Sequence, residues 1–144
     1  MQWFFAALDS ELVSPLQTVF YICFIITALY LLLFVDVPIE GVEKSLGHTI
    51  STLWAVLLIV GPATWLTGLA AHGQLAYHGM WARLIGDITA GGAITVYIIC
   101  ILATTPWGKG VFSPGIAAPT AICILLLAIR DARRIIQVEK RVRR

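Results

Sequence analysis

Charged residues are scarce in this chain, and they are nearly absent from its long apolar stretches. Of the 144 residues, 59% are hydrophobic and 12% are charged, whereas soluble domains carry about 25% charged residues. Apolar runs cover residues 16–35, 50–71, 84–103 and 116–129, and Asp87 is the one charge that falls within them. This pattern leaves no room for a soluble catalytic domain and indicates a protein that acts in or across a bilayer.

The sequence also lacks the motifs of most enzymes and cofactor proteins. Its three cysteines are widely separated, so none forms the C-x-x-C pair of a redox relay. His48, His72 and His78 lie near the ends of the apolar runs, where neither a haem nor a clustered zinc site is expected. No phosphate-binding loop, nucleophile motif or acid pair occurs. We therefore expect no enzyme activity, no cofactor, no metal and no small-molecule substrate.

The apolar runs predict four transmembrane helices. A helix needs about 20 apolar residues to cross about 30 Å of hydrocarbon, and the first three runs supply them. The fourth run is shorter, but Pro114 and Gly115 extend it outward and the stem of Arg130 can snorkel at its other end. We expect an all-α integral membrane protein that forms a single domain, with spans at about 16-35, 50-71, 84-103 and 114-130.

Both ends of the chain are expected at the membrane surface. The aromatic residues Trp3, Phe4 and Phe5 predict a short N-terminal interfacial helix. Residues 130-144 predict a basic C-terminal helical extension, whose charges would bind anionic lipid headgroups rather than nucleic acid. The residues expected at the headgroups are Arg130, Arg133, Arg134, Lys140 and Arg141.

The distribution of basic residues predicts the orientation of the chain. Seven of the ten Lys and Arg residues follow the fourth span, and positive loops stay in the cytoplasm. The C-terminus is therefore expected inside, and an even number of spans places the N-terminus inside too. The expected location is a bacterial cytoplasmic membrane, with residues 37–49 and 104–113 outside.

Small residues recur four positions apart in the middle spans. Such residues let two helices approach closely, because helix association in lipid depends on contact. Two uses remain open: packing of the chain's own bundle, or a face for self-association. The candidate packing residues are Gly61, Thr64 and Gly68 in the second span and Gly86, Ala90 and Gly91 in the third.

Asp87 is the polar residue that most needs a partner. It lies inside the third span, and Arg83 precedes it by four residues on the same helical face. We expect Arg83 and Asp87 to form a local polar pair. The pair would either anchor the helix or have a functional role, as intramembrane acids often do. In both cases Asp87 should not face lipid.

As a whole, the layout resembles small four-span proteins encoded by phages of actinobacteria and described as holin-like. The likeness consists of the aromatic N-terminal stretch, the second-span pattern Gly61-Pro62-x-x-Trp65-Leu66-x-Gly68, the Gly/Ala-rich third span and the Arg-rich end after Ile129. The resemblance implies a protein that oligomerises in the cytoplasmic membrane and assists host lysis. Contact through Gly86/Ala90 and Thr64/Gly68 would hold the copies together.

Other classes of function stay open on the sequence. A non-catalytic accessory subunit of a larger membrane complex would use the same small-residue faces against unlike chains. A phage exclusion or immunity protein would use the outer loops. A small transporter would need a polar pathway, and the sequence offers only Asp87 and scattered hydroxyls for one. The expected partners are thus the lipid bilayer and either copies of the same chain or other membrane subunits.

Overall fold

The computed structural model describes residues 13–34, 47–104 and 112–142 of the chain. Its elements are, in chain order, α2 (Val13–Phe34), α4 (His48–Ala70), the short 3-10 helix η1 (Gly73–Leu75), α5 (Ala76–Thr104) and α6 (Phe112–Val142). The described part is therefore all-helical. Four of these helices are long and apolar enough to cross a membrane, which is the four-span architecture that the sequence predicts.

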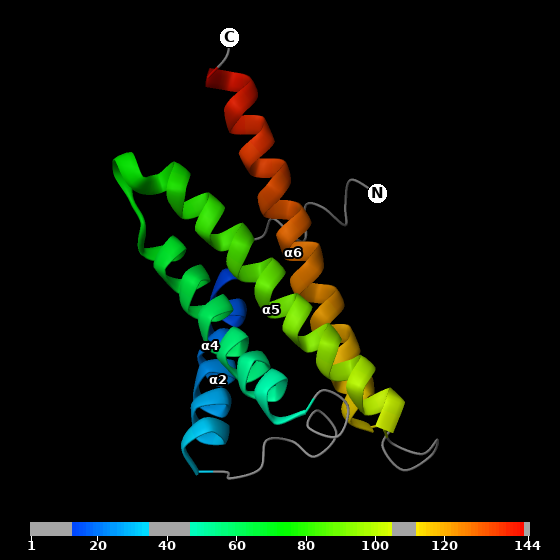
Figure 1. The fold of residues 1–144 in the computed structure, drawn as a ribbon. Helices are drawn as coiled ribbons and strands as arrows, with labels where there is room; N and C mark the ends of the chain where they lie inside the picture. The colour runs from blue at the N-terminus through cyan, green and yellow to red at the C-terminus, as the bar shows by residue number, and fades with distance from the viewer. Residues whose placement is uncertain (1–12, 35–46, 105–111, 143–144) are drawn as a thin grey trace.

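The structure bears differently on the two extensions expected at the ends of the chain. The predicted interfacial helix at Trp3–Phe5 lies outside the described residues. The basic segment after Arg130 is not a separate helix, because α6 continues without a break for 31 residues from Phe112 to Val142. The fourth span and the basic segment thus form one element, and the C-terminal end of α6 rises beyond the rest of the bundle in Figure 1.

The helices run up and down, so that α2 begins and α6 ends on the same side of the bundle (Figure 1). The main contacts join α2 to α4, α4 to α5, and α5 to α6. The tight turn at η1 allows α4 and α5 to be neighbours, and Gly73 adopts a φ of 62° there, which suits a residue without a side chain. Helix α5 is accordingly the most covered span, with 50% of its most apolar window buried.

Glycines set the close approach of α4 and α5. A Cβ added to Gly61 would lie 2.9 Å from the amide nitrogen of Ala90, and one added to Gly86 would lie 2.7 Å from the carbonyl oxygen of Gly61. Near the η1 turn, a Cβ on Gly68 would lie 2.6 Å from the carbonyl oxygen of Gly79. These backbones could not meet if larger residues stood at the crossing.

Helix α6 packs along the whole length of α5. Near the middle, Gly91 of α5 lies against Ile124 and Leu125 of α6. Near the end, the hydroxyl of Tyr77 donates a hydrogen bond to Glu139 Oε1 at 2.8 Å. Ile135, which lies within the basic segment, is buried. The segment after Arg130 therefore begins as part of the bundle and is not a free tail.

Helix α2 is the least covered span, with only 17% of its most apolar window buried. One narrow stripe faces the bundle and includes Gln17, Tyr21 and Ala28. The opposite side of the helix is exposed, and we call it the outer face of α2. It consists of Val19, Ile22, Cys23, Ile26, Tyr30 and Leu33.

Candidate functional site

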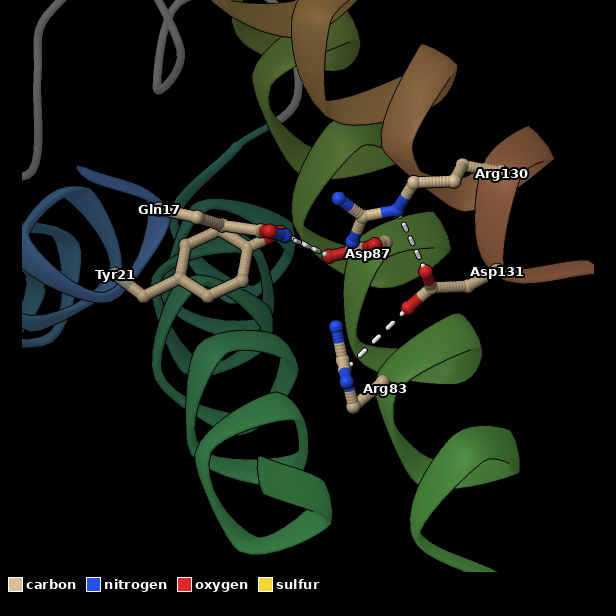
Figure 2. Close-up of polar contacts among 6 residues, drawn as sticks. All are labelled: Gln17, Tyr21, Arg83, Asp87, Arg130 and Asp131. Carbon is tan, nitrogen blue, oxygen red and sulfur yellow. Dashed lines mark hydrogen bonds and ion pairs between the residues drawn. The ribbon is translucent and has the colours of Figure 1, made fainter. Parts of the chain in front are cut away.

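A cluster of polar side chains lies inside the bundle, at the end where α2 begins and α6 ends. Three helices contribute to it, and Figure 2 shows the side chains pointing toward one another. We call it the intramembrane cluster. Its 6 members are Gln17 and Tyr21 from α2, Arg83 and Asp87 from α5, and Arg130 and Asp131 from α6.

Asp87 is the centre of the contact between α5 and α2. Its side chain is fully buried. Gln17 Nε2 donates to Asp87 Oδ1 at 2.7 Å, and the hydroxyl of Tyr21 donates to the same oxygen at 2.5 Å. Gln17 and Tyr21 lie one turn apart on α2, so a single face of that helix presents both donors. Such bonds to a carboxylate are short and strong because the acceptor is charged.

Asp131 joins α6 to α5 in the same cluster. Arg130 Nε donates to Asp131 Oδ1 at 2.9 Å. Arg83 Nε forms a longer ion pair with Asp131 Oδ2 at 3.4 Å, which lacks the geometry of a hydrogen bond. Arg130 and Asp131 are nearly fully buried, whereas the side chain of Arg83 is 20% exposed. The guanidinium group of Arg130 lies between Asp131 and Asp87 in Figure 2.

Trp65 of α4 connects the two halves of the cluster. Its ring is completely buried. The ring of Tyr21 meets it edge-on, with centroids 5.1 Å apart, and the guanidinium carbon of Arg83 lies 5.5 Å from its centroid. A cation over an indole face is attracted by the ring's quadrupole. All four spans therefore contribute a side chain to this end of the bundle.

The length of α5 gives an estimate of the depth of the cluster in a bilayer. Helix α5 has 29 residues and is therefore about 44 Å long, against about 30 Å of hydrocarbon. If the excess is shared equally between its ends, Asp87 lies about 10 Å inside the hydrocarbon edge and Arg83 about 4 Å. Charges at that depth are costly unless they are paired. Two guanidinium groups and two carboxyl groups meet here, so the formal charges of the cluster cancel.

The partner of Arg83 differs from the one that the sequence suggests. The expected local pair was Arg83 with Asp87, four residues apart. In the structure Arg83 pairs with Asp131 of α6, and Asp87 is bonded to Gln17 and Tyr21 of α2. Long-range partners replace the local one because α5 lies between α2 and α6, and its two polar side chains reach opposite neighbours.

The residues expected at lipid headgroups divide into two groups. Arg133, Lys140 and Arg141 have exposed side chains, and Arg134 is half-buried. Arg130, in contrast, is 6% exposed and belongs to the intramembrane cluster. Instead of lying at the surface, its side chain donates to Asp131, because it lies on the buried side of α6.

The small residues lie where helices of the same chain meet. Gly61, Gly68, Gly86 and Ala90 are buried at the crossing of α4 and α5, and Gly91 contacts α6. The hydroxyl of Thr64 donates to the carbonyl of Val60 in its own helix at 2.7 Å. The faces expected to join separate copies, Gly86/Ala90 and Thr64/Gly68, are therefore occupied within one chain, apart from the half-buried Thr64.

Sequence reasoning did not identify four participants of the site: Gln17, Tyr21, Trp65 and Asp131. A signal for them does exist. Gln17 and Tyr21 are polar side chains four residues apart in a mostly apolar span, as Arg83 and Asp87 are in theirs. Matching spacings near the start of two parallel spans, the first and the third, would have indicated an interhelical contact.

Two cavities adjoin the bundle core between α2 and α6. The first, which we call the side groove, has a volume of about 280 Å³ and is lined by Gln17, Phe20 and Tyr21 of α2 and by Cys123 and other residues of α6. The second, which we call the second groove, is also open at its rim; it has a volume of about 450 Å³ and is lined by side chains from all four helices, among them Trp54 and Tyr97. Thr120 lines both, so the cavities are neighbours.

Within the described residues, no group of three or more His, Cys, Asp or Glu side chains is placed to hold a metal ion.

Searches with this chain found no matching family model, no matching curated protein and no matching solved structure. The candidate site is therefore defined by its own geometry: a charge-balanced polar cluster inside the helix bundle, with an apolar groove beside it.

Proposed function

We propose that this chain acts by assembling in the cytoplasmic membrane and weakening its barrier, in the manner of the holin-like phage proteins that its layout resembles. Both termini are inside, because seven of the ten basic residues follow the last span. The chain has no catalytic role in this proposal. Its action depends on contacts between helices of neighbouring copies.

The observation that supports assembly is the exposure of α2. Only 17% of its most apolar window is buried, against 50% for α5. Ile26 and Leu33 of the outer face are 61% and 70% exposed. Because the glycine faces of α4 and α5 are occupied within the chain, the outer face of α2 is the surface that a second copy would cover. Contact between side chains, not expulsion from water, provides the attraction in lipid.

The intramembrane cluster supplies the polar groups that loss of the barrier requires. Ions cross a bilayer only where polar groups face water at membrane depth. In the single chain α2 covers Asp87 through Gln17 and Tyr21. Assembly that draws α2 toward a neighbouring copy uncovers this carboxyl group and its cationic neighbours. The cluster is thus sealed in the single chain and accessible in the assembly.

Membrane potential in cells that express the chain alone tests this function. The proposal predicts an abrupt collapse, reported by a potential-sensitive dye, once expression passes a threshold. The double variant Ile22→Ala/Ile26→Ala should delay the collapse, because it removes contact area from the outer face of α2. The matched control Ile88→Ala/Ile99→Ala changes two similarly exposed residues of α5 and should collapse on the original schedule.

A second outcome of this experiment would favour a different class of function. If the membrane potential and cell growth stay normal at high expression, the chain does not weaken the membrane barrier by itself. The exposed face of α2 would then be the docking surface of an accessory subunit, and the chain should be recovered from its native host in fixed stoichiometry with larger partners. If both double variants delay the collapse of the membrane potential equally, copies do not meet specifically through the outer face of α2.

A further inference from the structure

The last turns of α6 have one side on the bundle and the opposite side exposed. Asp131 and Ile135 are buried, and Glu139, one turn further on, is half-buried and accepts the hydrogen bond of Tyr77. These three residues of α6 lie four apart and therefore share the side of the helix that faces α5. The opposite side is exposed, and we call it the basic stripe. It consists of Arg133, Gln137, Lys140 and Arg141.

The basic stripe carries three positive charges and no negative one. The two acids between residues 131 and 142 are Asp131 and Glu139, and both contact α5 on the other side of the helix. The stripe is also fixed in direction, because α6 continues without a break from its apolar part and the buried Ile135 holds this segment in the bundle. Its three cations therefore form one surface that points away from α5.

The level of the stripe in a bilayer follows from the ion pair between Arg83 and Asp131. The paired atoms are 3.4 Å apart, so on the same placement of α5 the helix α6 passes Asp131 about 4 Å inside the hydrocarbon edge. At about 1.5 Å per residue it reaches that edge near Arg133, and a headgroup layer of about 5–8 Å takes up the next turn. Lys140 then lies just beyond this layer, and its long side chain reaches back into it.

An exposed isoleucine beside the stripe favours lipid over a soluble partner. Ile136 is 50% exposed. It lies three residues after Arg133 and four before Lys140, so a basic side chain flanks it one turn away in each direction. In water this isoleucine would have no apolar contact. At the level of the headgroups it meets the first methylene groups of the acyl chains, while its basic neighbours reach the phosphates.

We propose that the basic stripe binds the headgroups of anionic phospholipids. The phosphate oxygens accept from Arg133 and Lys140, and the guanidinium group presents a fork that matches two of them. The Gln137 amide, between these two side chains on the stripe, donates a further bond. A zwitterionic headgroup binds less tightly, because its own ammonium group cancels the charge of its phosphate. This binding goes beyond the barrier function and does not rest on it, since assembly involves α2 and the stripe lies on α6.

Native mass spectrometry of the full chain in a nonionic detergent tests the proposal, because it counts the lipid molecules bound to each chain. The probes are phosphatidylglycerol and phosphatidylcholine with the same acyl chains. The wild type should bind phosphatidylglycerol more tightly. Arg133→Gln/Lys140→Gln should lower this affinity about fivefold for each charge removed, the factor that about 1 kcal/mol per basic side chain provides, and should leave the binding of phosphatidylcholine unchanged.

Two further variants separate the stripe from the net charge of the chain. Lys44→Gln/Lys109→Gln is the matched control, because it removes the same charge from other parts of the sequence, and it should keep the preference of the wild type. Arg133→Lys/Lys140→Arg retains both charges and should keep it too. Arg133 and Lys140 are exposed, so we expect all of these variants to fold.

Three results would overturn the proposal. Equal affinity for the two lipids would show that the stripe does not select anionic headgroups. An equal loss of affinity in the Lys44/Lys109 control would show an effect of net charge alone. Binding of glycerophosphoglycerol, the same headgroup without acyl chains, as tightly as phosphatidylglycerol would show a site for soluble anions. None of these results depends on whether the chain collapses the membrane potential, so this proposal and the barrier function fail separately.

Discussion

Replacing Gly86 by alanine should destabilise the bundle, although alanine is the better helix former. A Cβ at this position would lie 2.7 Å from the carbonyl oxygen of Gly61 and 2.7 Å from both the amide nitrogen and the Cβ of Trp65. Carbon atoms in real structures do not approach so closely, and two of the three neighbours are backbone atoms. Helices α4 and α5 must therefore separate, and overpacking of this kind costs about 1–3 kcal/mol.

Gly92→Ala is the matched control on the same helix. A Cβ added to Gly92 meets nothing within 4 Å, so the substitution should gain up to about 1 kcal/mol of helix propensity. Both substitutions gain the same helix propensity, so the two variants should differ by the overpacking cost alone, about 1–3 kcal/mol in the free energy of unfolding. Denaturation in mixed detergent micelles, followed by tryptophan fluorescence, measures this difference. If Gly86→Ala unfolds at the same denaturant fraction as Gly92→Ala, the close contact between α4 and α5 is wrong.

The remaining predictions concern the intramembrane cluster and the orientation of the chain. Tyr21→Phe should lower the free energy of unfolding by about 1.5–3 kcal/mol, the worth of a hydrogen bond to a charged group. Asp87→Leu should lower the free energy of unfolding by about 3–5 kcal/mol, because it leaves guanidinium charge uncompensated in the bundle. The same denaturation in detergent micelles measures both variants. Thr89→Ala, which removes only a bond to the helix's own backbone, should stay within about 0.5 kcal/mol, and an equal loss in this control would contradict the role of the cluster. Reporter fusions at Gly73 and Arg144 should report the cytoplasm and those at Glu43 and Lys109 the outside, and an external C-terminus would overturn the orientation.

The helices could be predicted from the sequence because hydropathy alone determines them. In lipid every backbone group must be bonded within the segment, so an apolar run of sufficient length becomes a helix. The ends were less predictable. A helical extension after Ile129 was expected, and α6 does run to Val142, but its packing was not expected: Ile135 is buried in the bundle and Tyr77 bonds Glu139. Packing against α5, not hydropathy, sets this boundary.

The partners within the site could not be predicted in the same way. Arg83 and Asp87 have the spacing of a local pair, and although Gln17 and Tyr21 share that spacing, nothing in the sequence shows that Arg83 pairs with Asp131 instead of Asp87. The small residues pose the same problem. A Gly86/Ala90 face can meet another copy or another helix of its own chain, and only the position of Gly61 opposite it decides between them. The spacing of residues in the sequence indicates which side chains need a contact, whereas the fold determines which residue supplies that contact.

Oxidative crosslinking of the native cysteines tests most directly whether copies meet through the outer face of α2. Cys23 belongs to that face, Cys123 lines the side groove, and Cys100 is buried. In membranes treated with a mild oxidant, the wild type and Cys123→Ser should form a disulfide-linked dimer, and Cys23→Ser should not. A dimer that persists in Cys23→Ser and disappears in Cys123→Ser, or no dimer at expression levels that collapse the membrane potential, would contradict assembly through α2.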